Sequence, residues 1–256
     1  MDKTPRILAV CGKGGVGKTS ISAMLARHFS RDPGNRVLAI DADPAIGLAT
    51  ALGITVGKTV DDIRNDLIRQ VTSGQSADKA RMLAMLDYEM FSAIEERRNL
   101  AFIAIGRPEK EGCYCQVNHI LKDVIASVAG NFNYVVIDGE AGIEQVNRRV
   151  METVTHLLLV SDASAKGIRV ADTIRQVAAA AIGFERAGLI LNRIRDSGEY
   201  DRLAIPPGME PLGWLPEDDR LRDADIKGES LLDLPDTPAF EALKSCLAAL
   251  GLDMVN

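Results

Sequence analysis

Short apolar runs rich in β-branched residues alternate along the chain with stretches in which apolar residues recur at helical spacing. The short runs predict buried strands near Ile7–Cys11, Arg36–Asp41, Leu100–Ile105, Tyr134–Asp138, His156–Ser161, Gly188–Leu191 and Pro211–Trp214. The amphipathic stretches predict helices at Thr19–Ser30, Val60–Val71, Lys79–Arg97, Val117–Ala129, Gln145–Thr153, Ile168–Ala181 and Pro238–Leu250. This alternation favours an α/β fold, a single doubly wound, mostly parallel sheet flanked by helices.

The length of 256 residues, 46% of them hydrophobic, suits one domain with a sizeable core. We therefore expect a single domain over residues 1–256. The segment 51–97 contains two predicted helices with no evident strand between them, so we expect a helical insertion after the second strand.

Charge, hydropathy and cysteine content limit the expected partners and the expected cellular compartment. The formal net charge is −6 and the basic residues form no block, so nucleic acid is not expected as a partner. No apolar run approaches the ~18 residues of a membrane span, and residues 1–6 have no signal-peptide character. With four cysteines expected as thiols rather than disulfides, we expect a cytoplasmic protein.

The stretch GKGGVGKT at residues 12–19 fits the phosphate-binding loop pattern G-x-x-x-x-G-K-[ST]. It follows the first predicted strand and precedes the first predicted helix, as this loop requires. Backbone N–H groups exposed by the glycines form an anion-binding nest, Lys18 reaches the β- and γ-phosphates, and the Thr19 hydroxyl binds Mg²⁺. The predicted ATP/ADP site comprises Gly12, Lys13, Gly14, Gly15, Val16, Gly17, Lys18, Thr19 and Ser20.

Lys13, a second lysine near the start of the loop, resembles the signature lysine of the deviant Walker A NTPases, which include the nitrogenase iron protein and the Min and Par ATPases. In that class this lysine crosses a homodimer interface to the partner's nucleotide, and the resemblance therefore implies a homodimer with a catalytic Lys13. A solvated loop lysine is the alternative.

Carboxylates at two strand ends fit the same class. The second strand ends in the string DADP, in which the resemblance gives Asp43 the role of orienting the attacking water and gives Asp41 support of the Mg²⁺ shell or of the fold. Many relatives have an aspartate where this chain has Ala45. The fourth strand ends at Asp138, a Walker B position, so Thr19, Asp43 and Asp138 are expected around Mg²⁺.

Three further features are expected at the nucleotide. Gly142 fits the loop that senses the γ-phosphate. Asn192, which follows the sixth strand, and the later Pro-bearing turn resemble the adenine-contacting pair of the family. The expected base contacts are Asn192, Arg193, Pro216 and Glu217. An ordinary strand-end asparagine is the alternative.

The pair Cys113 and Cys115 lies within GCYCQ at residues 112–116. Two thiolates fill half of the shell that Zn²⁺ or square-planar Ni²⁺ requires, and a twofold axis through a homodimer would supply the other half. A redox dithiol, two buried cysteines, or a one-chain site that includes His119 are the alternatives.

Taken in order, GKGGVGKT, DADP, GCYC and IDGEAGIE resemble the CooC family, the nickel-insertion ATPases that mature carbon monoxide dehydrogenase. The resemblance covers nearly the whole chain. It implies an ATP-hydrolysing homodimer that carries Ni²⁺ (or Zn²⁺ in vitro) at the joined cysteine pairs and delivers it to carbon monoxide dehydrogenase. The rivals are an iron–sulfur reductase of the nitrogenase iron-protein type and a Min/Par-type positioning ATPase. A membrane role is disfavoured, because Lys244 is the single basic residue of the C-terminal stretch 238–256.

Overall fold

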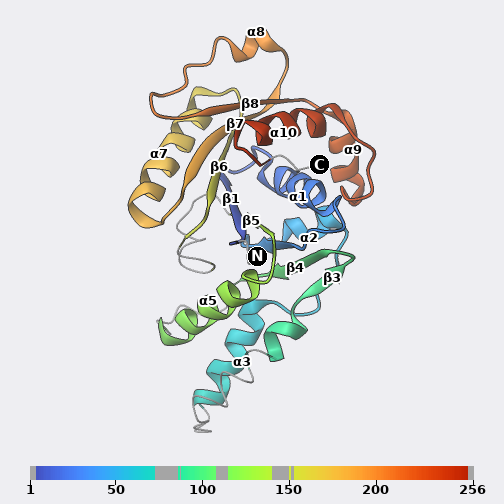
Figure 1. Cartoon of the computed structure of the whole chain (residues 1–256), viewed down its shortest axis with the longest axis vertical. Helices are drawn as coiled ribbons and strands as arrows, with labels where there is room; N and C mark the ends of the chain where they lie inside the picture. Colours follow the sequence, from blue (N-terminus) through green and yellow to red (C-terminus); the bar gives the residue numbers. More distant parts are fainter. Residues whose placement is uncertain are drawn as a thin grey trace.

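The computed structural model describes residues 4–72, 86, 88–107, 115–139, 150 and 153–252. Its centre is an eight-stranded sheet in the order β3-β4-β2-β5-β1-β6-β7-β8 (Figure 1). Every strand pair is parallel except β3 with β4 at one edge. The prediction of one mostly parallel sheet with helices on its faces is therefore confirmed.

Every predicted strand is present, with ends that move by up to a few residues. The strands are β1 (Arg6–Gly12), β2 (Val37–Asp41), β3 (Glu95–Arg97), β4 (Leu100–Ala104), β5 (Tyr134–Asp138), β6 (His156–Ser161), β7 (Arg186–Ile194) and β8 (Pro211–Pro216). Within β1, Leu8 and Val10 belong to one buried core and Ala9 and Cys11 to the other. Buried residues on both sides of a strand give the continuous apolar runs that marked the central strands in the sequence.

Helices cover both faces of the sheet. The helices are α1 (Lys18–Ser30), α2 (Gly47–Leu52), α3 (Val60–Thr72), α5 (Cys115–Ala129), α7 (Ala165–Ala181), α8 (Ser197–Tyr200), α9 (Asp219–Lys227) and α10 (Pro238–Ala249). Apolar residues of α3, α5 and α7 share one core, and those of α1, α2 and α10 share the other. Figure 1 shows α7 on one side of the central strands and α1 with α10 on the other.

The prediction of a helix over Lys79–Arg97 is wrong at its C-terminal end. Glu95–Arg97 instead forms β3, which pairs antiparallel with β4. This strand is short, charged and at the edge of the sheet, so it has none of the apolar residues that signal a buried strand. Residues 73–85 and 87 lie outside the described residues.

Among the helices in the described ranges, α2, α8 and α9 were not predicted. Two of them, α2 and α8, are too short to show a helical period. The predicted helix Gln145–Thr153 lies mostly outside the described residues, and its last residue is not helical, because Thr153 forms a parallel bridge with Gly183. Within the described ranges, no helix has the length and apolar character needed to cross a membrane.

Candidate nucleotide site

Polar side chains gather where the central parallel strands end. The loop after β1 follows Gly12, and Asp41 and Asp138 end the neighbouring strands β2 and β5 in register with each other. The carboxyl ends of parallel strands share one edge of the sheet, which is where open α/β sheets bind ligands. The structure thus brings the predicted loop and both predicted strand-end carboxylates together.

The phosphate-binding loop has the tight backbone that its glycines allow. Gly17 has φ 92°, and a Cβ atom there would lie 2.3 Å from the Asn192 side-chain nitrogen. Lys18, which begins α1, is buried, and its Nζ donates a hydrogen bond to the Lys13 carbonyl oxygen at 3.3 Å. The ammonium group therefore bridges the loop, and the start of α1 adds the positive end of a helix to this anion site.

Within the single chain, Lys13 forms an ion pair with Asp162. Its Nζ is 3.5 Å from the Asp162 carboxylate, which follows β6 and also accepts from the Ser164 N–H at 3.1 Å. Burial alone would raise the pKa of Asp162, but hydrogen bonds from Ser164 and the charge of Lys13 hold it below its usual value. The lysine therefore has a partner within its own chain, which the sequence did not reveal.

The Asp138 carboxylate fits a magnesium ion bound with nucleotide. Its Oδ1 accepts from the Ser22 hydroxyl at 3.0 Å, while its buried Oδ2 has no hydrogen-bond partner among the described residues. Burial raises the pKa of Asp138 to about 6, an effect opposed by the Thr19 and Ser22 hydroxyl groups and by Lys18. This carboxylate oxygen and the nearby Thr19 hydroxyl are hard oxygen ligands of the kind that Mg²⁺ takes, together with water and phosphate oxygens, in nucleotide sites.

Asp41 and Asp43 shape the loop after β2. Asp41 is fully buried and accepts backbone N–H groups through both oxygens, from Asp43 at 3.0 Å and from Leu48 at 2.8 Å. Burial and the charge of Asp138 raise the pKa of Asp41 to about 7, although these hydrogen bonds oppose the rise. Asp43 is half-buried and accepts the Ala45 N–H at 2.9 Å through Oδ1. Asp41 therefore holds the loop, and Asp43 keeps its second oxygen for other partners.

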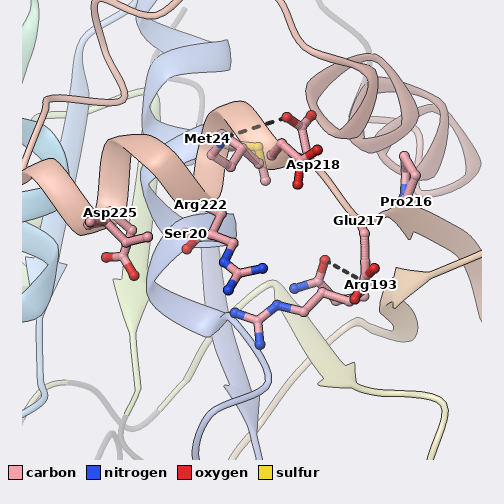
Figure 2. Close-up of a pocket in the computed structure, with 12 residues that line it drawn as sticks. Ser20, Met24, Arg193, Pro216, Glu217, Asp218, Arg222 and Asp225 are labelled. Carbon is pink, nitrogen blue, oxygen red and sulfur yellow. Dashed lines mark hydrogen bonds between the residues drawn. The ribbon is translucent and has the colours of Figure 1, made fainter.

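A cavity of about 460 Å³ opens beside the phosphate-binding loop. Its walls include five predicted contacts, Ser20, Asn192, Arg193, Pro216 and Glu217 (Figure 2). The Asn192 amide donates to the Val16 carbonyl oxygen at 2.8 Å, and the Arg193 guanidinium donates to the Gly15 carbonyl oxygen at 3.2 Å. Both side chains therefore tie the end of β7 to the loop while lining the cavity.

Helix α9 supplies a wall of this cavity that the sequence analysis missed. Leu221, Arg222, Asp225 and Ile226 line it, and Figure 2 shows Arg222 and Arg193 extending toward each other. A sequence signal was present, because Asp218 caps the helix through the Arg220 and Leu221 N–H groups and Gly228 ends it in the left-handed conformation.

Two predicted residues, Gly142 and Cys113, lie outside the described residues. Cys115 is the first residue of α5, so this helix begins two residues before the predicted start at Val117. No group of three or more His, Cys, Asp or Glu side chains that could hold a metal occurs within the described part of the chain.

Comparison with known proteins shows the family to which the chain belongs. Residues 7–232 match CbiA, the CobQ/CobB/MinD/ParA nucleotide binding domain, and the chain belongs to this family of ATP-binding P-loop NTPases. It is 35% identical over 233 residues to an uncharacterized ATP-binding protein of Methanocaldococcus jannaschii, a match that covers 90% of this chain and 92% of the relative.

Two further similarities bear on function and fold. The chain is 29% identical to the carbon monoxide dehydrogenase accessory protein CooC of Rhodospirillum rubrum, over 97% of both chains. The solved structure of the septum site-determining protein MinD of Pyrococcus horikoshii, complexed with Mg-ADP, shares the fold. Its TM-score is 0.66 at 22% identity, with 97% of this chain and 96% of that chain covered.

Proposed function

We propose that this protein is an ATP-hydrolysing metallochaperone that acts as a homodimer, binds Ni²⁺ through Cys113 and Cys115 of both subunits, and delivers the metal to carbon monoxide dehydrogenase. The observation that supports it is the similarity to CooC over 97% of both chains, together with a cysteine pair suited to half of a four-thiolate site.

A physical connection between the cysteine segment and the nucleotide site supports the proposal. Cys115 starts α5, and Leu121 and Ile125 of that helix share a buried core with Val135 and Ile137 of β5. β5 ends at Asp138, so the helix shares a core with the strand that carries the Walker B carboxylate. A close-packed core transmits small displacements, since its side chains cannot deform independently.

Within the nucleotide site, the proposed roles are those that the family resemblance implies, and the positions of Lys18 and Asp138 support them. Lys18 binds the β- and γ-phosphates, and Thr19 and Asp138 hold Mg²⁺, which when bound neutralises phosphate charge. Asp43 orients the attacking water. Lys13 leaves Asp162 and reaches the partner's nucleotide, where its positive charge stabilises the charge that develops during phosphoryl transfer.

The test measures bound nickel per dimer in the wild type and in the Cys113→Ala/Cys115→Ala variant. We expect about one nickel per dimer in the wild type and almost none in the variant. The matched control is Cys246→Ala, which removes a buried thiol of α10 and should leave nickel content unchanged. Equal nickel content in wild type and double variant would refute the site.

The same preparations separate the rivals. An iron–sulfur reductase would turn brown on anaerobic reconstitution with iron and sulfide, and a positioning ATPase would pellet with vesicles or DNA in an ATP-dependent way. Either result without nickel binding would replace the metallochaperone proposal.

A further inference from the structure

A second cavity, of about 270 Å³, lies at the opposite end of α1 from the nucleotide. Helix α1 contributes Ser20 and Met24 to the first cavity, and Arg27 and Ser30 of its last turn to the second. Four arginines line the second cavity, Arg27, Arg31, Arg97 and Arg98, with one carboxylate, Asp233. Nothing in the proposed function uses this cavity.

The carboxylates near this cavity balance only part of its charge. Arg97 donates from one nitrogen, Nη2, to both carboxylate oxygens of Asp233, at 2.9 and 2.7 Å, while Arg27 and Arg31 share Asp236. Four guanidinium groups thus face two carboxylates. Arg27 is also largely buried, and burial and the neighbouring charge of Arg31 lower its pKa. The cavity retains an excess of positive charge, which an anion would relieve.

Of the four arginines, Arg98 has no carboxylate partner among the described residues. It is exposed, and its side chain has no hydrogen bond or ion pair within the part of the chain that the structure describes. Its φ is 58°, and it is the first residue of the two-residue loop that joins Arg97 to Leu100. A hairpin loop with positive φ at that position favours glycine, so an arginine here costs stability that a glycine would not. Despite this cost in stability, the chain has an arginine here, and its guanidinium lines the cavity.

We propose that this four-arginine cavity binds the phosphate group of a small phosphorylated molecule. Arginine forks match phosphate oxygens with two parallel hydrogen bonds, and a doubly charged phosphate equals the two uncompensated positive charges. The volume is about nine times the ~30 Å³ that one water occupies in the liquid, which leaves room beyond the phosphate itself. The Asp233 carboxylate is exposed and would compete with the ligand for Arg97.

Calorimetric titration of the full chain with inorganic phosphate tests this site. All variants carry Lys18→Ala, so that the phosphate-binding loop contributes little. We expect saturable binding in this background and at least about tenfold weaker binding with Arg98→Gly added, because a charged hydrogen-bond donor is lost. Asp233→Asn should have the opposite effect and tighten binding, because it frees Arg97 and removes a competing negative charge.

The controls keep folding separate from binding. Arg98→Gly suits the positive φ, so its melting temperature should not fall, and Arg195→Gly removes an exposed arginine elsewhere and should leave phosphate binding unchanged. The absence of saturable phosphate binding, or binding that Arg98→Gly does not weaken, would overturn the proposal. Tighter binding of malonate than of phosphate would overturn the assignment to a phosphate group.

Discussion

The ion pair between Lys13 and Asp162 leads to a quantitative prediction about dimer formation. If Lys13 acts on the partner's nucleotide, it must first leave Asp162, so this contact opposes the active dimer. Asp162→Asn removes the charge but keeps an oxygen that can accept the Ser164 N–H. We therefore expect Asp162→Asn to strengthen ATP-dependent dimerisation without disturbing the start of α7.

The magnitude follows from the geometry. Unit charges 3.5 Å apart attract by about 5 kcal/mol at an effective dielectric constant of ~20. The two side chains are 34% and 37% exposed, so hydration and side-chain ordering reduce the net contribution to about 0.5–1 kcal/mol. A dimer releases two such pairs, so the gain is about 1–2 kcal/mol, or a dimer dissociation constant about 5–30 times smaller.

Sedimentation equilibrium with a non-hydrolysable ATP analogue measures this constant. The matched control is Asp223→Asn, which makes the same charge change at an exposed position of α9. Lys13→Ala should bind nucleotide but lose turnover. If Asp162→Asn leaves the dimer constant equal to that of Asp223→Asn, or weakens the dimer, then Asp162 does not hold the lysine back and the reasoning fails.

Two further predictions concern the stability of the fold and nucleotide binding. The hydrogen bonds from Arg31 hold the pKa of Asp236 well below its usual value, and Arg27 also pairs with this carboxylate. The ionised Asp236 side chain therefore stabilises the fold fully above about pH 4, and this stabilisation is lost as the pH falls further. Asp236→Asn should cost about 1 kcal/mol of unfolding free energy at pH 7 and less at pH 3, where the carboxyl group of the unfolded chain is mostly protonated; an equal loss at both would contradict this origin. Gly17→Ala should weaken nucleotide binding at least about tenfold, because its Cβ would lie 2.3 Å from the Asn192 side chain and φ is 92°. Gly17→Ala should also lower the free energy of unfolding, measured with a denaturant, and this loss should be smaller in an Asn192→Ala background, where the clashing side chain is absent. An equal loss in both backgrounds would show that the clash is unimportant.

The sequence was sufficient for features that depend on local pattern. Strands buried on both faces appear as continuous apolar runs, so β1, β2, β4, β5, β6 and β7 were predicted. The phosphate-binding loop was predicted because its glycine spacing is a local requirement of the backbone, which Gly17 at φ 92° illustrates. Asp41 and Asp138 were recognised because a carboxylate directly after a buried strand is costly unless it has a partner or a use.

Contacts between distant parts of the chain were decided only by the tertiary structure. Lys13 meets Asp162 across 149 positions, and Asn192 meets Val16 across 176. The arginines of the second cavity come from α1 and from the β3–β4 hairpin, which was itself not predicted. Such contacts depend on which elements become neighbours in the sheet, and strand order is set by the packing of whole elements rather than by any local spacing of residues.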